Sequence, residues 1–376
     1  METIRTRSFA RAGLLGNPSD GYFGKTLSFT FTQFGVDLTL TESSRIRFQQ
    51  GEVDDATFGS MDELARNLRL YGYYGGIRLL KATTKRFFDW CQEHGVALPD
   101  RNFSVEYKIN IPRLVGLSGS SAICSAMLKA LMKFYGVTIP LEYQPTLCLE
   151  AERDELGINC GFQDRVIQIY NGLVFMDFDR AFVEAHNFGK YEQLWENAKA
   201  EGKGGDGQRN LNLYIGYDGN RAEESGKAHQ KVKKLFEAKN EDVLAAMSEF
   251  ADIAQQGRDL LADHLLTFSP SHPLTLSPSH LRTLSTLINA NFDLRDRIFH
   301  VAEENRRMVM TARKSGASAK FAGSGGAIVG TYEDEAQFEQ LKADLATIGT
   351  TVIKPVIATV ADESAEFSTT GVWRNS

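Results

Sequence analysis

A short run of glycine and serine, GLSGSSA at residues 116–122, has the composition of an anion-binding loop. It stands directly before an apolar-periodic segment that predicts a helix from about Ser120. The first N–H groups of a helix have no partner inside the helix, and the positive end of the helix dipole lies at the same place. Glycines let a backbone approach a ligand closely. The loop therefore predicts a phosphate site, although it lacks the GK[ST] ending of a Walker A loop.

The same residues also have a purely structural explanation. Small side chains in a turn let a helix pack closely on a sheet, and Ser120 could serve only as the helix N-cap. A lone glycine motif does not distinguish the two explanations, so other motifs are needed to decide between them.

Alternating apolar and polar residues predict the strands that lead to this loop. Residues 5–15 and 25–49 have this pattern, with the turn-forming stretch GNPSDGYFG between them. Residues 103–111 alternate most regularly, so this strand is expected to have one solvated face. Periodicity and stop signals predict three helices, at residues 73–94, 142–156 and 163–170. A further strand is predicted at residues 173–178.

The second half combines long helical patterns with few strands. Helical periodicity extends over residues 222–262 and 281–314, and AKFAGSGGAIVGTY at 319–332 predicts two strands joined by a glycine-rich turn. A glycine-rich stretch at 201–210 reads as a loop near a domain boundary. A Ser/Pro insertion at 266–280, in which L-T-x-S-P-S-H occurs twice, separates the two helical regions.

The composition excludes several classes of protein. The chain has 376 residues, of which 42% are hydrophobic and 24% charged, as in ordinary globular proteins. A net charge of −6 gives no overall positive field for a nucleic acid or an anionic membrane, and the four cysteines lack zinc or disulfide spacing. The sequence has no bilayer-spanning apolar run and no signal peptide at its first residues. We expect a cytoplasmic protein, monomeric or homodimeric, with domains at residues 1–185 and 186–376.

Three motifs, in order, resemble those of the GHMP small-molecule kinases. IPRLVGLSGSSA at 111–122 resembles the family's phosphate loop, P-x-x-x-G-L-x-S-S-A, but is one residue longer. SFARAGLLGNPSDGYFG at 8–24 resembles the first motif, with Asn17 where many members have glutamate, and KFAGSGGAIV at 320–329 resembles the third. Within this superfamily the chain most resembles the glucuronokinases, through further stretches such as YYGGIRLL and ELGINCGFQDRV.

The resemblance implies an α+β, two-domain GHMP kinase fold, with an N-terminal domain like domain 2 of ribosomal protein S5 and a ferredoxin-like C-terminal domain. The site would lie between the domains. The implied reaction transfers a phosphoryl group from ATP, with Mg²⁺ as cofactor, to the anomeric hydroxyl of D-glucuronate. Other substrates stay open, namely galacturonate, another aldose or a heptose phosphate. A non-catalytic nucleotide or sugar sensor of the same fold also stays open.

The resemblance also implies the site residues. Asp164 would be the base or orienter of the sugar hydroxyl, Arg11 the cation that lowers the pKa of that hydroxyl, and Ser121 with Glu152 the metal ligands. Residues expected at the ATP phosphates are Pro112, Gly116, Leu117, Ser118, Gly119, Ser120, Ser121, Ala122, Gly323, Ser324 and Gly325. Residues expected at the sugar acid are Asn17, Ser19, Asp20, Tyr74, Gly75, Gly76, Lys227 and Arg258. The candidates to pair its carboxylate are Arg11, Lys25, Arg78, Lys227 and Arg258.

Three of these assignments have ordinary structural alternatives that the sequence leaves open. An acidic residue such as Asp164, at the start of a helix, is a favourable partner of the helix dipole. Glu152 could lie on a solvated helix face, and residues 323–326 could form a plain hairpin bend.

Overall fold

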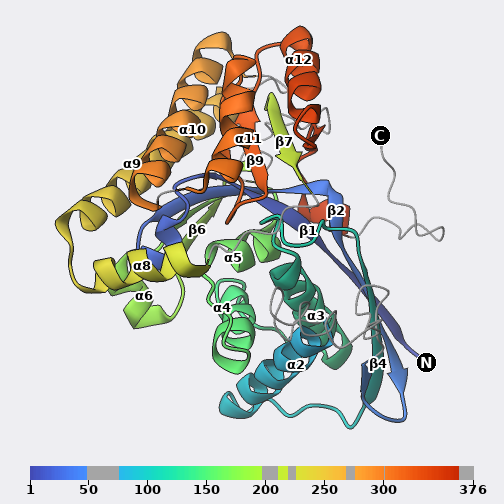
Figure 1. The fold of residues 1–376 in the computed structure, drawn as a ribbon. Helices are drawn as coiled ribbons and strands as arrows, with labels where there is room; N and C mark the ends of the chain where they lie inside the picture. The colour runs from blue at the N-terminus through green and yellow to red at the C-terminus, as the bar shows by residue number, and fades with distance from the viewer. Residues whose placement is uncertain (49–75, 197–210, 219–225, 268–275, 300, 364–376) are drawn as a thin grey trace, which may run out of the picture.

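The computed structural model describes residues 1–48, 76–196, 211–218, 226–267, 276–299 and 301–363 (Figure 1). In this part of the chain the elements form two α+β halves, each built on its own sheet. No helix within it is both long enough and apolar enough to cross a membrane.

Two long antiparallel strands, β1 (Thr3–Leu15) and β2 (Lys25–Ser43), form the centre of the first sheet. The strand order is β3-β4-β2-β5-β6, with β1 paired to β2. The shorter strands are β3 (Arg47–Phe48), β4 (Asn102–Ile109), β5 (Leu173–Asp177) and β6 (Lys190–Gln193). In β4 the buried residues Phe103, Val105 and Tyr107 alternate with more exposed ones, which confirms the predicted strand with one solvated face.

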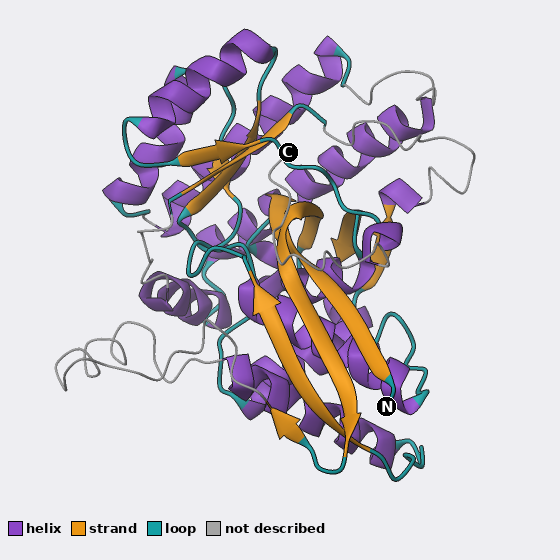
Figure 2. Cartoon of the chain, turned by 90° about the vertical axis from the view of Figure 1, so that its right-hand side faces the viewer, coloured by secondary structure: helices purple, strands orange, loops and turns teal. Residues whose placement is uncertain are grey.

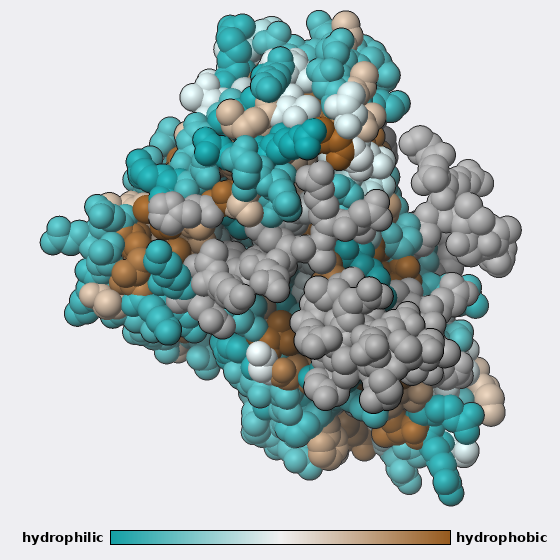
Figure 3. Space-filling view, in the orientation of Figure 1, coloured by the Kyte–Doolittle hydropathy of each residue, from teal (hydrophilic) through white to brown (hydrophobic). Residues whose placement is uncertain are grey.

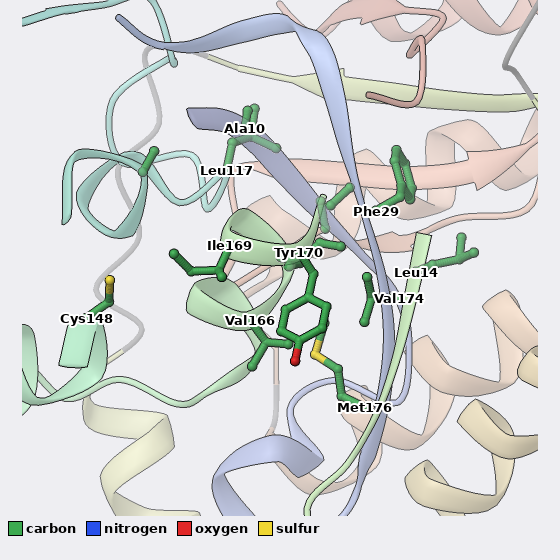
Figure 4. Close-up of a cluster of buried hydrophobic side chains, with 14 of the residues drawn as sticks. Ala10, Leu14, Phe29, Leu117, Cys148, Val166, Ile169, Tyr170, Val174 and Met176 are labelled. Carbon is green, nitrogen blue, oxygen red and sulfur yellow. The ribbon is translucent and has the colours of Figure 1, made fainter. Parts of the chain in front are cut away.

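Helices gather behind the long strands of this sheet (Figure 2). They are α2 (Gly76–Glu93), α3 (Gly119–Tyr135), α4 (Gln144–Glu150) with a π-helical turn at Ala151–Glu155, α5 (Gln163–Tyr170) and α6 (Arg180–His186). The central helix, α3, is buried on nearly every side because it packs against α2, β1 and β2. Val166, Ile169 and Tyr170 of α5 belong to the same buried apolar cluster as Phe29 of β2 and Met176 of β5 (Figure 4).

The second half contains a four-stranded antiparallel sheet in the order β10-β7-β9-β8. Its strands are β7 (Leu213–Tyr217), β8 (Lys320–Phe321), β9 (Ala327–Thr331) and β10 (Thr351–Ile353). Its helices are α8 (Gly226–Glu237), α9 (Glu241–Thr267), α10 (Pro278–Phe299), α11 (Glu303–Lys314) and α12 (Glu335–Ala346). Hydrophilic side chains cover most of the upper face over α9 to α12 in Figure 3, as expected of the solvated side of amphipathic helices.

After β10 the chain returns to the first sheet. The N–H of Thr32 donates to the carbonyl of Val356 at 3.0 Å, and that of Ala358 donates to Thr30 at 2.8 Å. The short helix α13 (Val360–Glu363) follows, and Glu363 forms an ion pair with Lys129 of α3. The last described residues therefore pack on the N-terminal half.

Most elements agree with the sequence predictions, but two boundaries differ. The first sheet extends beyond residue 185, because β6 at 190–193 pairs with β5, and residues 356–363 rejoin it. The Ser/Pro insertion is shorter than predicted, because α9 continues to Thr267 and α10 begins at Pro278, where the missing proline N–H costs nothing. Residues 268–275 of the insertion and the glycine-rich stretch 201–210 lie outside the described residues.

The two halves meet where β1 passes between the glycine-rich loops. The N–H of Gly13 in β1 donates to the carbonyl of Ala322 at 2.7 Å. The loops also touch each other, since a Cβ added to Gly323 would lie 2.2 Å from the carbonyl oxygen of Gly116. Only glycine permits this approach.

We expect Gly116→Ala to destabilise the protein more than Gly136→Ala. Both glycines flank α3 at similar φ angles, +74° and +66°, so each alanine pays a comparable cost of about 1–2 kcal/mol for the left-handed backbone. At Gly116 the new Cβ would also lie 2.8 Å from the carbonyl oxygen of Gly325, whereas nothing lies within 4 Å at Gly136. The added overlap should cost about 1–3 kcal/mol more. Urea unfolding of both variants measures the difference, and equal losses would contradict the close contact of the loops.

Candidate active site

The guanidinium of Arg11, on β1, contacts three separate segments. Its Nε donates to Oδ1 of Asp164 at 2.7 Å, and its Nη1 donates to the carbonyls of Gly116 at 2.6 Å and Ala322 at 3.0 Å. The Arg11 side chain is only 6% exposed. Because little water reaches it, these partners must stabilise its positive charge. Arg11 thereby joins α5, the 116–122 loop and the 323–326 loop.

Asp164 lies in the first turn of α5, beside the start of α3. Its second oxygen, Oδ2, accepts a hydrogen bond from the hydroxyl of Ser118 at 2.7 Å. Burial alone would raise the pKa of Asp164, but the charges of Arg11 and Arg165 and the hydrogen bonds outweigh it and lower the pKa to about 2. The carboxylate is therefore ionised at physiological pH, and 23% of the side chain stays exposed.

Arg11 and Asp164 border a cavity of about 350 Å³, which is within the usual range for a small-molecule site. Apolar residues of β4 and the following loop form one wall, and the segment around Cys160 and Gly161 forms another. Of the sequence-predicted residues, the cavity is lined by Arg11, Gly76, Pro112, Gly116, Leu117, Ser118, Gly119, Ser120, Asp164 and Ser324. The structure thus brings one residue of the 323–326 loop to the cavity formed by the phosphate loop and α5.

Helix α3 begins at Gly119 and its N-cap is Ser118, with φ 63° and ψ 51°. The explanation of Ser120 as a simple N-cap is therefore wrong. The side chain of Ser118 makes no cap hydrogen bond to the N–H groups of this end, as a helix start that binds an anion requires.

Two basic residues that were not among the predicted site residues lie beside the 323–326 loop, and one of them, Arg295, holds it. Arg295 of α10 donates from Nη1 to the carbonyl of Gly323 at 2.8 Å and from Nη2 to that of Ser324 at 2.9 Å. Lys320 is 1% exposed, and its ammonium group donates to the carbonyl of Gly13 at 2.6 Å and to Oδ1 of Asn17. Burial, followed by the charges of Arg295 and Arg11, lowers the pKa of Lys320 well below its usual value.

The structure corrects two expected sugar ligands in the first motif. Asn17 is 4% exposed, its side-chain oxygen is held by Lys320, and its carbonyl accepts from Asn291 at 3.2 Å. Ser19 is fully buried and donates to the carbonyl of Lys25 at 2.8 Å. Oδ1 of Asn17 and the hydroxyl of Ser19 are therefore used within the protein, and neither residue lines the cavity.

Asp20, the third candidate in this turn, caps the segment that carries Asp164. Its Oδ2 accepts from the N–H of Gln163 at 3.2 Å, and a Cβ added to Gly161 would lie 2.1 Å from the same oxygen. Burial is the main cause that raises the pKa of Asp20 to about 6, and the charge of Asp164 adds to it. The pKa of Asp20 is therefore raised above the ordinary aspartate value, whereas the pKa of its neighbour Asp164 is lowered below it.

The other expected sugar ligands are placed less favourably. Arg258 of α9 forms a two-point ion pair with Glu192, at 2.9 Å and 2.7 Å, and does not line the cavity. We therefore no longer expect it to pair the substrate carboxylate. Lys227 lies in α8, where only its backbone is described, and Tyr74 and Gly75 lie outside the described residues. Gly76 lines the cavity, where a Cβ would lie 1.7 Å from the hydroxyl oxygen of Tyr107.

The two expected metal ligands are buried behind the cavity wall. Glu152, in the π-helical turn, is fully buried and not on a solvated helix face. Its Oε2 accepts from Nε of Arg165 at 2.7 Å and from Nη2, whereas its Oε1 has no hydrogen-bond partner in the described part of the chain. The buried hydroxyl of Ser121 donates to the carbonyl of Ser118 at 3.3 Å. Neither residue is among those lining the cavity, and the described residues contain no cluster of three metal-ligating side chains.

Comparison with known proteins connects this geometry to a family. The chain is 41% identical over 330 residues to "Probable glucuronokinase 2" of Arabidopsis thaliana, covering 86% of this chain and 82% of the relative. The chain belongs to the glucuronokinase branch of the GHMP kinases. "Glucuronokinase 1" of the same plant is 39% identical, with 87% and 84% covered, and residues 78–172 match the model of the GHMP kinases N terminal domain.

Solved structures bear on the fold alone. A galactokinase of Lactococcus lactis, solved in complex with galactose, superposes with a TM-score of 0.67 at 14% identity, covering 95% of this chain and 94% of the other. The predicted α+β GHMP kinase fold is thereby confirmed.

We expect Asp20→Asn to stabilise the protein at neutral pH but not at acidic pH. Because the folded-state pKa of Asp20 is raised to about 6, its favourable contribution is fully present at low pH and is lost as the pH rises from about 4 to 6. Asparagine keeps an oxygen for Gln163 and does not ionise. The variant should gain about 1–3 kcal/mol of unfolding free energy at pH 7.5. Urea unfolding at pH 4 and pH 7.5 tests this, and an equal effect at both values would refute it.

Proposed function

We propose that the enzyme transfers the γ-phosphoryl group of ATP to the anomeric hydroxyl of D-glucuronate, giving D-glucuronate 1-phosphate and ADP. The observation that carries the reaction type is the Arg11–Asp164 pair at the edge of a cavity on which both glycine-rich loops converge. Support for the sugar comes from the two plant relatives named glucuronokinase, because both align over more than four-fifths of each chain. ATP and a sugar acid are then its small-molecule partners, and we propose the cytoplasm as its compartment.

The phosphates of ATP would lie at the N-terminus of α3. Phosphoryl transfer depends mainly on positioning and on charge stabilisation, and helix N–H groups supply both without reorganisation. Ser120, Gly119 and Ser324 line the cavity at this end and are the proposed phosphate contacts. We assign the same role to the backbone of the other predicted loop residues that carry an N–H group, Gly116, Leu117, Ser121, Ala122, Gly323 and Gly325.

Asp164 would orient the sugar hydroxyl and accept its proton. Its pKa of about 2 makes it a weak base, so it would take the proton late, after the forming O–P bond has drawn electron density from the hydroxyl oxygen and made its proton acidic. A loose transition state requires little activation of the nucleophile, and a weak base is sufficient for it. The adjacent Arg11 would stabilise the charge that accumulates during transfer.

We infer that Mg²⁺ accompanies the nucleotide, and that Glu152 and Ser121 hold it. The buried, unpartnered Oε1 of Glu152 fits a cation, since a carboxylate oxygen without a hydrogen bond is costly unless a charge satisfies it. Its other oxygen is already fixed by Arg165. When bound, the ion would neutralise phosphate charge and orient the transferred group.

The reaction is tested by coupled ADP release with Mg·ATP and a panel of glucuronate, galacturonate, glucose, galactose and mevalonate. We expect turnover with glucuronate alone. Asp164→Ala should lower kcat by about 10²–10⁴-fold, the usual contribution of a general base. Asp242→Ala, in the exposed first turn of α9, is the matched control and should keep the parent rate. If another sugar is turned over instead, that sugar is the substrate. If Asp164→Ala keeps full activity, Asp164 has no part in the mechanism.

Glu152→Gln should raise the Mg²⁺ concentration needed for half-maximal activity by about 10-fold or more, as lost metal contacts do. The amide keeps the size of the side chain and one oxygen for Arg165. Glu150→Gln is the control, because Glu150 forms a comparable ion pair with Arg86 at 2.6 Å and does not line the cavity. Identical Mg²⁺ titrations of the two variants would show that Glu152 serves only as the partner of Arg165.

A further inference from the structure

Ser118 occupies a backbone conformation that its residue type disfavours. With φ 63° and ψ 51° it lies in the left-handed region, which costs a non-glycine residue free energy. Gly116 and Gly119 stand on either side of it in the same loop. The loop therefore uses glycine at positions where only backbone freedom is needed. A serine at such a position points to a task for its side chain.

The backbone of Ser118 is fixed without help from its hydroxyl. Its carbonyl accepts hydrogen bonds from the side chain of Gln168 at 2.9 Å, from the N–H of Ala122 at 3.2 Å and from the hydroxyl of Ser121 at 3.3 Å. The hydroxyl therefore contributes little to holding the loop. Its contact is with Oδ2 of Asp164, at 2.7 Å.

Oδ2 of Asp164 has a competing partner. Nη1 of Arg165 lies 3.8 Å from it, too far for a hydrogen bond but close enough to attract the carboxylate. Arg11 fixes only the other oxygen, Oδ1, and a single contact leaves the carboxylate free to rotate about its terminal bond. The Ser118 hydroxyl is the group on the cavity side that opposes this rotation, because Ser118 lines the cavity.

We propose that Ser118 is a positioning residue that holds Oδ2 of Asp164 toward the sugar hydroxyl, and that it is not a phosphate ligand. The role rests on the proposed kinase reaction. Ser118 also lies where the loop exceeds the family pattern by one residue, so the longer loop places a side-chain donor against the base. A change in the phosphate loop would then be transmitted directly to Asp164.

The test compares Ser118→Ala with Ser118→Gly, alone and with Asp164→Asn. Both substitutions delete the hydroxyl, but glycine also removes the backbone strain. We expect both to lower kcat for glucuronate by about 10- to 100-fold, as small misplacements of a reacting group do. The KM for ATP, and the Kd for ATP measured calorimetrically without sugar, should change less than about threefold. With Asp164→Asn present, either substitution should change kcat less than about twofold, because no carboxylate remains to be aimed.

Each alternative role gives a different result. If Ser118→Gly keeps near-parental activity while Ser118→Ala loses activity, the residue contributes only through its backbone conformation. A large rise in the Kd for ATP with kcat retained would make the hydroxyl a phosphate ligand. Losses that multiply with Asp164→Asn would show that the two residues act separately. If the parent turns over no sugar while it still binds ATP, the proposed function fails and this inference fails with it.

Discussion

A single buried cation, Arg11, links three parts of this molecule that are distant from one another in sequence. Its donors meet Asp164, Gly116 and Ala322, which come from α5 and from both glycine-rich loops. A buried charge is tolerated only where it is paired and hydrogen-bonded, so none of these segments can move away without leaving the guanidinium uncompensated. The geometry of the cavity therefore depends on one side chain in the middle of a β-strand.

The same requirement explains how the glycine-rich loops can serve an anion. The carbonyls of Gly116, Ala322, Gly323 and Ser324 all accept hydrogen bonds from Arg11 or Arg295. A carbonyl oxygen occupied by a buried cation is not available to repel a phosphate, and the cation's field reaches the ligand through the loop. Lys320 completes this basic layer, and burial together with the charges of Arg295 and Arg11 lowers its pKa well below the usual value.

The sequence was sufficient to predict the elements that a local residue pattern or a family motif determines. The strands β1, β2, β4 and β5, and α3 with its preceding loop, follow from alternation, helical periodicity or the three motifs. The family resemblance named Arg11 and Asp164, but their pairing is visible only in the fold. The roles of Arg295 and Lys320 could not be predicted, because an arginine in a helical pattern and a lysine before an apolar strand look like ordinary surface charges. Asn17 and Ser19 were misassigned for the opposite reason. Their side chains make hydrogen bonds within the protein, and only the fold shows that Lys320 and Lys25 are their partners.

The return of the chain to the first sheet after β10 affects how the two halves can move. The chain passes from the first sheet to the second between β6 and β7, and it crosses back between β10 and residue 356. The two halves are therefore joined at two places in the chain, and the C-terminal segment cannot leave the first sheet without breaking the hydrogen bonds of Thr32 and Ala358. The C-terminal crossing also carries the Lys129–Glu363 ion pair, so the end of the described chain is attached to α3, the helix that begins at the phosphate loop, although neither of those residues lines the cavity.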